Sequence, residues 1–395
     1  MNLPDNIFTI YSGQEDVKLS RPKLAYAWYD QYKINLLSGK KENTNPAQFH
    51  AFLNELYLLD NHKKTVIHLT YEFGFYYLFD NYKYKKDTLL GIVIKYEKKE
   101  RFYPEKGYPI ELSPISSPSK EQYRQAFKQG RQKLLNGDCY QFNLTCPYQF
   151  KFTGKSPLDF INQLWANPKL KGAYAHVTWL PYFNKMILSN SPECLFQMSK
   201  NHQGFLCWSM PIKGSIKVSS PENYHQAWNN LKRSRKDQAE LFMIADMLRN
   251  DLSKIEKPKA QVIKKKIPLM VPQILHQCSL IKVQLSEKIT LGQILKNIFP
   301  GGSITGAPKK RVVEILLDLE NYDREFYTGS TIILDEEVMA SSINIRTAEI
   351  DFKAEKLTYK SGGGITLRSN TNAEFKEMEL KLISFLKIFK ALSYN

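Results

Sequence analysis

The stretch AYAHVTWLPYFNKMILSN at residues 173–190 decides the fold, because it contains two strand-like runs, Ala173–Leu180 and Lys185–Asn190. The first run is rich in β-branched and aromatic residues, which favour strands. Similar runs lie on either side, at Tyr140–Thr145 and Phe205–Trp208. The centre of the chain is therefore expected to be a sheet.

The N-terminal part is expected to be less regular. Residues 1 to about 110 contain strand-like runs at Thr65–Phe79 and Leu89–Tyr96, and a connector with four prolines follows. Ser119 then starts a capping-box pattern. The helix that it begins is expected to end at Asn136-Gly137, where glycine can supply a left-handed cap.

The rest of the chain mixes strands with helices. A helical block from about Pro221 to Leu252 follows the central strands. Later strands are predicted at Ser330–Leu334, Met339–Ile350 and Leu357–Lys360, and later helices at Pro308–Leu319 and Asn372–Leu386. This order argues against a regular βαβ repeat and predicts an α+β fold with large, mostly antiparallel sheets.

Bulk composition indicates one enzyme-sized globular body. The chain has 395 residues, of which 43% are hydrophobic and 24% charged, so it can bury a large core. The N-terminus has no basic region followed by an apolar run, and no stretch approaches the roughly 18 apolar residues that span a bilayer. The five cysteines form no CxxC pair. We therefore expect a cytoplasmic protein with reduced thiols and no membrane segment.

A net charge of +17 raises the question of nucleic-acid binding. Basic residues cluster locally at Tyr82–Lys86, Lys232–Lys236 and Lys264–Lys266. These clusters are scattered along the chain, and no nucleic-acid-binding motif accompanies them. We expect no nucleic-acid partner, and a solvated basic surface or attraction of a small polyanionic substrate explains the charge.

The segment MPIKGS at residues 210–215 places Lys213 between proline and glycine. An unprotonated lysine is a good nucleophile, and burial of its ammonium group lowers its pKa enough to make it one. Most lysines are solvated surface charges, so the meaning of Lys213 depends on the groups around it.

Two carboxylate pairs have helical spacing. Asp237 and Glu240 are three residues apart, as are Glu374 and Glu377, so each pair lies on one face of a predicted helix. Two such pairs facing each other would form an oxygen-rich site for magnesium. A capping role for Asp237 after Ser234, or solvated surface carboxylates, would give the same spacing.

Glycine-rich segments supply candidate anion sites. FPGGSITGAP at residues 299–308 leads into a predicted helix, and Ser361–Gly364 interrupts a strand pattern. Backbone N–H groups at such places can bind carboxylates, although plain turns use the same residues. Arg346 alternates with apolar residues and can bind a carboxylate with two hydrogen bonds, or form a salt bridge at a strand edge.

Taken in order over residues 119 to 388, the segments resemble the chorismate-utilising enzymes, which include anthranilate, aminodeoxychorismate, isochorismate and salicylate synthases. The matching blocks are Asp138–Thr145, Ser191–Phe196, Met210–Ser215, Lys236–Asp251, Phe299–Lys309, Asn344–Ala348 and Gly362–Glu377. The resemblance implies a two-layer sandwich of large antiparallel sheets flanked by helices. It also implies a chorismate-binding catalytic domain at 119–388, intertwined in one structural unit with the loosely matching region 1–110.

The resemblance assigns roles to named residues. Glu193 matches a general acid that protonates the C4 hydroxyl as it leaves, and His276 matches an active-site histidine near the ring. Glu240 and Glu377 match ligands of a magnesium ion, with Asp237 and Glu374 acting through water. Substrate-binding positions are matched by Ser215, Thr305, Gly306, Tyr327, Arg346, Gly362 and Gly363.

Two positions distinguish the branches of the family. The isochorismate and salicylate branch has a water-activating lysine where this chain has Gln141. Anthranilate synthases have alanine at Lys213, whereas aminodeoxychorismate synthases have lysine and are thought to attack C2 of chorismate with it. The resemblance thus favours component I of aminodeoxychorismate synthase, which makes 4-amino-4-deoxychorismate for 4-aminobenzoate and folate synthesis. Anthranilate synthase component I is the main alternative, ahead of a water-using synthase or a non-catalytic basic binding protein.

Two features qualify the match. Many relatives have Asp-Ser-Asp-Pro after the triple glycine, whereas this chain has Arg368-Ser369-Asn370-Thr371, which makes the region near the expected magnesium site less acidic. No segment resembles a glutamine amidotransferase. We therefore expect a separate glutaminase subunit that supplies ammonia.

Overall fold

The computed structural model describes residues 3–58, 64–106, 108–218, 220–271, 274–335 and 339–389. Its N-terminal strands are β1 (Phe8–Ser12), β2 (Asp16–Tyr29), β3 (Tyr32–Asn35), β4 (Lys41–Asn43), β5 (Thr65–Leu69), β6 (Leu89–Arg101) and β7 (Ser113–Ser116). The central strands are β8 (Gln141–Lys151), β9 (Tyr174–Leu180), β10 (Lys185–Ser191), β11 (Cys194–Asn201), β12 (Gly204–Ser209) and β13 (Ile212–Lys217). The later strands are β14 (Gln261–Val271), β15 (Ile274–Leu285), β16 (Gly306–Ala307), β17 (Ser330–Leu334), β18 (Met339–Ile343), β19 (Thr347–Asp351) and β20 (Lys356–Ile365).

Helices occur throughout the described chain. They are α1 (Pro46–Leu58), α2 (Gly74–Leu78), α3 (Lys120–Leu135), α4 (Pro157–Trp165), α5 (Tyr224–Arg233), α6 (Arg235–Ser253), α7 (Leu291–Ile298), α8 (Gly302–Thr305), α9 (Lys309–Leu319) and α10 (Thr371–Leu386). Within these ranges, no helix is both long and apolar enough to cross a bilayer.

The strands form one continuous series of antiparallel pairs. From one end, the order is β15, β12, β11, β18, β17, β5, β6, β2, β1, β9, β10, β19, β20 and β8. Strands β13 and β14 both pair with β15 at one end, and β7 and β16 pair with β8 at the other. The predicted α+β class with large antiparallel sheets is confirmed.

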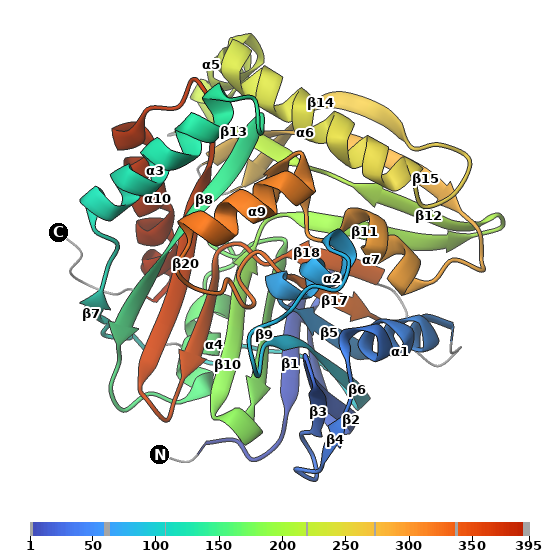
Figure 1. Cartoon of the computed structure of the whole chain (residues 1–395). Coiled ribbons are helices and arrows are strands. Elements are labelled where there is room, and N and C mark those ends of the chain that lie inside the picture. The colour runs from blue at the N-terminus through green and yellow to red at the C-terminus, as the bar shows by residue number, and fades with distance from the viewer. Residues whose placement is uncertain are drawn as a thin grey trace.

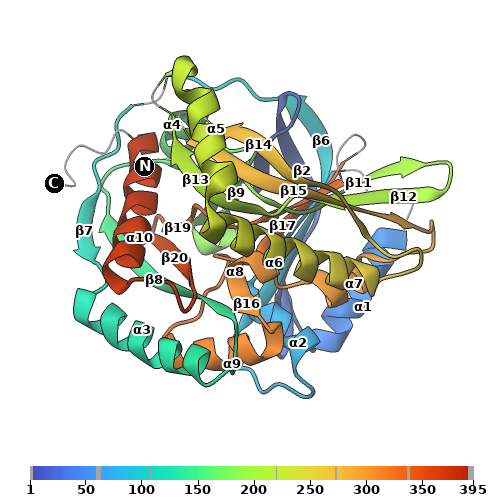
Figure 2. The same cartoon turned by 90° about the horizontal axis from the view of Figure 1, so that it is seen from above.

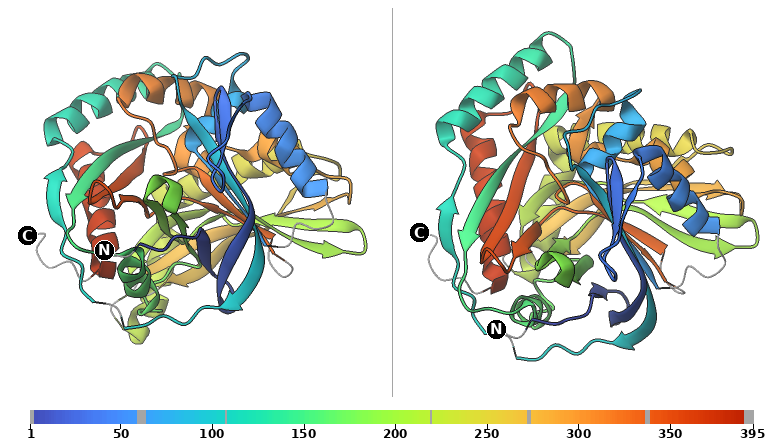
Figure 3. Two further views of the ribbon diagram at one scale, coloured as in Figure 1. Left: turned by 90° about the horizontal axis from the view of Figure 1, so that it is seen from below. Right: turned by 60° about the horizontal axis from the view of Figure 1, so that its bottom comes forward.

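The series folds into two layers. Figure 1 shows β8, β20, β10 and β9 in one sheet at the lower left, and β11, β12, β14 and β15 in another at the upper right. The paired strands β2 and β6, blue and teal in Figure 3, stand where the two sheets meet. Residues before 110 and after 119 therefore share one sheet system, since β1 pairs with β9 and β5 pairs with β17.

Helices cover the outer faces of both layers. Helix α6 contacts β13, β14 and β15, and α10 contacts β20, as the view from above shows (Figure 2). One large core cluster lies around β8, β9, β10, β19 and β20, and a second lies around β5, β11, β15, β17 and the helices beside them. A smaller cluster fills the junction near β2 and β6.

The helices that the sequence predicts from caps are confirmed. Ser119 accepts hydrogen bonds from the N–H groups of Glu121 and Gln122, and Gly137 has a left-handed φ of 79° after the end of α3. Ser234 separates α5 from α6 and accepts a hydrogen bond from the Asp237 N–H group.

Two expectations about the N-terminal part were wrong in part. The predicted strand Thr65–Phe79 ends at Leu69, and helical turns follow because Tyr71, Phe73 and Phe75 pack into the second core cluster. Such tertiary packing outweighs the strand preference of aromatic residues. The N-terminal region is also more regular than expected, since β2 alone has 14 residues.

Other corrections concern the predicted active-site elements. The strand predicted at Met339–Ile350 is split into β18 and β19, and Arg346 lies in the break with a φ of 54°. The largely apolar run Leu241–Leu248 suggests a fully buried stretch of α6, but Phe242 and Asp246 within it are exposed. The glycines after Ser361 do not interrupt a strand: β20 continues through them and pairs with β8.

Candidate active site

The two ends of the strand series meet at Lys213. A Cβ atom added to Gly364 of β20 would lie 2.5 Å from Nε2 of Gln141 and 3.7 Å from Nζ of Lys213. Strand β20 therefore needs glycine here, because any side chain would enter the space between β8 and β13. This close approach explains why the last of the three consecutive glycines, Gly364, has no side chain.

A bulge in β13 directs the lysine. The pairing of β13 with β15 shifts register between Lys213 and Ser215, and Gly214 between them has a left-handed φ of 78°. A Cβ atom at Gly214 would lie 2.9 Å from Nε2 of Gln277 and 3.0 Å from Cβ of Asp237. Bulges of this kind re-aim a side chain beside a functional site.

Lys213 and Glu193 share a buried environment. Glu193 is 6% exposed and lies between β10 and β11, where its N–H group donates to Ser191 Oγ. Burial raises the pKa of Glu193, and the nearby Lys213 ammonium opposes this rise. Burial lowers the pKa of Lys213, and the negative charge of Glu193 opposes this decrease. Lys213 Nζ also donates to the Ser303 carbonyl oxygen over 3.4 Å.

His276 is positioned by its neighbours on the sheet. Its Nδ1 atom lies 2.7 Å from Ser215 Oγ on the paired strand β13. Burial lowers the pKa of His276 to about 4, and the positive charge of Arg346 acts in the same direction. The imidazole is therefore neutral at pH 7 and can exchange hydrogen bonds with a ligand without adding charge.

Arg346 is a cation without an anion. Among the described residues, no carboxylate forms an ion pair with its guanidinium, and burial lowers its pKa. The predicted alternative, a salt bridge at a strand edge, is therefore wrong. Tyr359 interacts with the charge of Arg346 and also with Tyr327, so these three side chains form one group. A buried, unpaired guanidinium suits an anionic ligand.

The four predicted metal-site carboxylates approach from two helices. The charges of Glu240 and Glu377 both raise the pKa of Lys213, which places the two carboxylates near the same lysine. Glu374 is 5% exposed, and its Oε2 atom would lie 3.5 Å from a Cβ atom at Gly363. Asp237 lies beside Gly214. The structure thus brings both pairs to the edge of one site.

These carboxylates suit a hard cation by their chemistry. Across the residues that the structure describes, no three acidic, histidine or cysteine side chains lie close enough together to hold a metal ion by themselves. Magnesium usually takes only one or two protein carboxylates and completes its shell with waters and substrate oxygens. A donor set of carboxylates therefore fits magnesium that is bound together with an anionic ligand.

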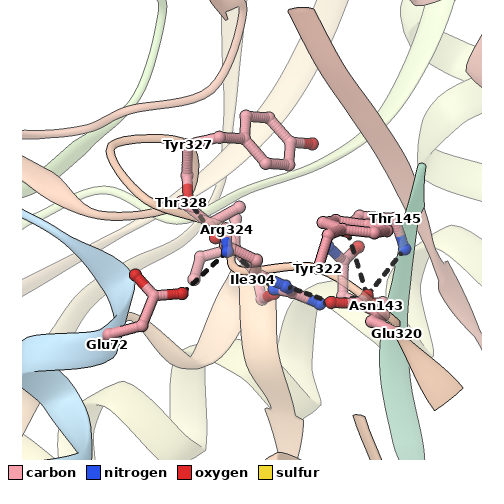
Figure 4. Close-up of polar contacts among 9 residues, drawn as sticks. All are labelled: Glu72, Asn143, Thr145, Ile304, Glu320, Tyr322, Arg324, Tyr327 and Thr328. Carbon is pink, nitrogen blue, oxygen red and sulfur yellow. Dashed lines mark hydrogen bonds and ion pairs between the residues drawn. The ribbon is translucent and has the colours of Figure 1, made fainter. Parts of the chain in front are cut away.

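The remaining predicted positions lie on α8, β16, β20 and the turn before β17. Thr305 is fully buried at the end of α8, and Gly306 has a φ of 132° where β16 pairs with Phe142 of β8. Gly362 and Gly363 lie in β20, paired with Thr145 and Leu144. Tyr327 is buried, and Figure 4 shows its ring directed away from Arg324.

Sequence reasoning missed two cations. Lys381 on α10 pairs with Glu377 over 2.9 Å and donates to the Gly362 carbonyl oxygen over 2.8 Å. Its spacing of four residues from Glu377 is a signal that could have identified it. Arg324 is 2% exposed and contacts groups from three parts of the chain, which no local spacing reveals.

Several buried polar atoms at the site are free to bind a ligand. Within the described ranges, the side-chain amides of Gln141 and Gln277 have no hydrogen-bond partner, and neither does Nδ2 of Asn344. Buried amides are usually paired, so orphaned amides near Lys213 and Gly214 suit a polar ligand.

Comparisons with known proteins agree on the family. Residues 12–387 match the chorismate binding enzyme family. Aminodeoxychorismate synthase component 1 from Salmonella typhimurium is 34% identical over 66% of this chain and 56% of the relative. The protein of the same name from Escherichia coli is 32% identical over 73% of this chain and 62% of the relative. The matched part of this chain thus spans between half and two thirds of each relative.

The fold has a close counterpart among solved structures. Anthranilate synthase component I from Streptococcus pneumoniae superposes with a TM-score of 0.76, over 98% of this chain and 93% of that chain, at 19% identity. The family match over nearly the whole chain and the shared fold agree, and the chain belongs to the chorismate binding enzyme family.

Proposed function

We propose that this chain is an aminodeoxychorismate synthase component 1, which converts chorismate and ammonia to 4-amino-4-deoxychorismate through a covalent bond to Lys213. The observation that carries the proposal is the half-buried Lys213 at the meeting point of the two sheet ends, electrostatically coupled to the buried carboxyl of Glu193. The relatives of that name, 32% and 34% identical, support it.

The pKa shifts of the pair are in the direction that the reaction needs. Burial raises the pKa of Glu193 and lowers that of Lys213, so both shifts favour the neutral forms, a free amine near a protonated carboxyl. An ion pair contains the same number of protons but leaves two charges in a poorly solvated site. The neutral form provides a nucleophile and a general acid at once.

Two allylic displacements account for the product. Lys213 Nζ bonds to C2 of chorismate, the ring double bond shifts, and the C4–O bond breaks as Glu193 donates its proton to the leaving hydroxyl, which departs as water. Ammonia then bonds to C4, the double bond shifts back, and the C2–N bond to Lys213 breaks. The incoming nitrogen loses a proton to the Glu193 carboxylate, which restores the acid, and the lysine leaves as the free amine. The enolpyruvyl group stays on the ring throughout.

Substrate binding is assigned to the unpaired polar groups. Arg346 and Tyr327 would hold one carboxylate of chorismate, and the backbone of Gly362 and Gly363 would contribute N–H groups. Neutral His276 would contact the ring substituents. Ser215 fixes the imidazole, and Thr305 with Gly306 shapes the wall of the site.

Magnesium is part of the proposal. Glu240 and Glu377 would hold it directly, and Asp237 and Glu374 would act through water. When bound, the ion would neutralise a substrate carboxylate beside these acidic side chains. The less acidic segment Arg368–Thr371 lies just before α10 and would weaken magnesium binding relative to a chain with two aspartates there.

The source of ammonia is proposed to be a separate glutaminase subunit. The matched relatives are named as a component 1, which supports a second component. We expect the chain alone to use ammonium salts but not glutamine, and to use glutamine once the subunit is added. Glutamine-dependent product from the purified chain alone would contradict this part of the proposal.

The test of the lysine route is Lys213→Ala. Because the variant lacks the nucleophile, we expect formation of aminodeoxychorismate to fall at least about 100-fold with chorismate, magnesium and ammonium. The control is Lys310→Ala, which removes an exposed lysine from α9 and should leave the rate unchanged. Unchanged aminodeoxychorismate formation by Lys213→Ala would refute the covalent route.

A further inference from the structure

Arg324 is a buried arginine behind the active site, and its guanidinium links several segments of the chain. Its Nε and Nη2 atoms donate to the two carboxylate oxygens of Glu320, each over 2.8 Å, as Figure 4 shows. Its guanidinium also lies over the ring of Tyr71, 4.6 Å from the ring centre. Both side chains of the ion pair are at most 5% exposed. This geometry fixes the plane of the guanidinium.

The guanidinium joins two segments that are far apart in sequence. Nη1 donates to the Ile304 carbonyl oxygen over 3.1 Å, and Nη2 donates to the Asn143 carbonyl oxygen over 2.6 Å. The first contact holds α8, next to the Ser303 carbonyl that accepts from Lys213. The second holds β8 beside Gly364 of β20. One side chain therefore sets the spacing between both walls around the lysine.

Glu320 also forms hydrogen bonds with β8. Its Oε1 atom accepts from the backbone N–H group of Thr145 over 3.0 Å and from Thr145 Oγ1 over 2.9 Å. The hydroxyl of Tyr322 lies 2.7 Å from the same Oγ1 atom. Strand β8 is thus held by hydrogen bonds at Asn143 and at Thr145, on both sides of Leu144, which pairs with Gly363.

The backbone of Arg324 is itself anchored. The Glu72 carboxylate accepts from the N–H groups of Arg324 and Glu325 over 2.7 and 3.0 Å. The Arg324 carbonyl oxygen accepts from the N–H group of Tyr327, so the turn that presents Tyr327 begins at this arginine. The N-terminal region thus supports the site through Glu72.

We propose that Arg324 is a positioning residue for the reactive lysine: its guanidinium, clamped by Glu320, holds α8 and β8 at the separation that keeps Lys213 enclosed opposite the Ser303 carbonyl. The proposal rests on the proposed function in taking Lys213 as the nucleophile. A lysine at position 324 would keep the charge but could not reach Glu320, Ile304 and Asn143 together, because it lacks the planar fork of donors.

The test is the reactivity of the Lys213 amine in Arg324→Lys. Trace acetylation of the folded protein with acetic anhydride at a series of pH values, followed by peptide mass spectrometry, gives the midpoint of Lys213 deprotonation without any turnover. Loosened walls admit water, so we expect the midpoint to rise by about one pH unit. We also expect kcat to fall about 10- to 100-fold, as for a small misplacement of a reacting group.

Two further variants make the result interpretable. Arg311→Lys alters a half-buried arginine of α9 that pairs with Asp138 and Glu314, and it should leave the Lys213 midpoint and kcat unchanged. Thr145→Val removes only the hydroxyl contacts to Glu320 and Tyr322 and leaves Arg324 in place, so it is the milder variant for use if Arg324→Lys does not fold, and it should move the midpoint in the same direction by less.

A shift confined to the melting temperature, with the Lys213 midpoint unchanged in Arg324→Lys and Thr145→Val, would overturn the proposal, because Arg324 would then only stabilise the fold. The acetylation readout stays valid if the enzyme makes a product other than aminodeoxychorismate. A negative result for the positioning role of Arg324 can therefore be distinguished from a negative result for the proposed function.

Discussion

At the scale of single residues, the account depends on burial acting on two opposite charges. Glu193 and Lys213 are close enough to stabilise each other as ions, yet burial shifts the pKa of each toward its neutral form. A carboxyl with a raised pKa stays protonated at higher pH, and a lysine with a lowered pKa loses its proton at lower pH. The two shifts therefore widen the pH range in which acid and nucleophile coexist.

Glu193→Gln tests the acid at this scale. The amide cannot donate a proton to the leaving hydroxyl, so we expect kcat/KM to fall about 100- to 10,000-fold. The alkaline decline in rate that arises from ionisation of Glu193 should also disappear from the pH profile. Glu314→Gln changes a half-buried glutamate on α9 that pairs with Arg311, and as the control it should keep both rate and profile. A normal profile in Glu193→Gln would remove this residue from the chemistry.

At the scale of elements, the sequence predicts features that depend on neighbours in the chain. The cap of α3 at Ser119 and the left-handed Gly137 after it are local, and both are present. The run Thr65–Phe79 failed because its aromatic residues are placed by the core of a distant segment. The triple glycine looked like a break in a strand because its true neighbour, β8, is more than 200 residues away.

Gly214→Ala tests the bulge that aims the lysine. The φ of 78° is unfavourable for alanine, which costs about 1 kcal/mol of unfolding free energy, and the new methyl group would meet Gln277 and Asp237. We expect this loss of stability together with a fall in kcat of at least about 10-fold. Chemical denaturation and steady-state kinetics on the same preparation measure both effects.

Gly137→Ala is the matched control for this variant. Gly137 has a φ of 79°, but nothing lies within 4 Å of an added Cβ atom. Its stability should fall by a similar amount while kcat stays at the parent value. Equal kcat values in the two variants would show that the bulge does not position Lys213.

At the scale of the whole molecule, the site is created by long-range pairing. Residues 141, 213 and 364 meet because the strand series folds back on itself, and no spacing in the sequence places them together. The family resemblance supplied most of the predicted site residues, since ordered motifs carry that information. Arg324 was missed because its partners Asn143, Ile304 and Glu320 become neighbours only in the folded chain.

Buried histidines should make the stability of the whole fold depend on pH. Burial lowers the pKa of His176 to about 4, from about 6.5 in the unfolded chain. The folded state binds fewer protons in this window, so the contribution of His176 to stability is present above pH 6.5 and is lost as the pH falls to 4. The difference corresponds to about 3 kcal/mol.

Urea unfolding of His176→Asn across this window checks the expectation. The variant should lose less stability than the parent between pH 6.5 and 4, whereas His202→Asn, at an exposed position, should follow the parent. Parallel pH curves for the parent and His176→Asn would contradict the assigned pKa.

The central claim is that the chain aminates chorismate at C4. The most direct test incubates the purified chain with chorismate, magnesium and nitrogen-15 ammonium at mildly alkaline pH, and identifies the product by mass and by nuclear magnetic resonance of the labelled carbon–nitrogen bond. The account predicts 4-amino-4-deoxychorismate, with the label on C4 and the enolpyruvyl group retained. Anthranilate, with the label on C2 and pyruvate released, would contradict it.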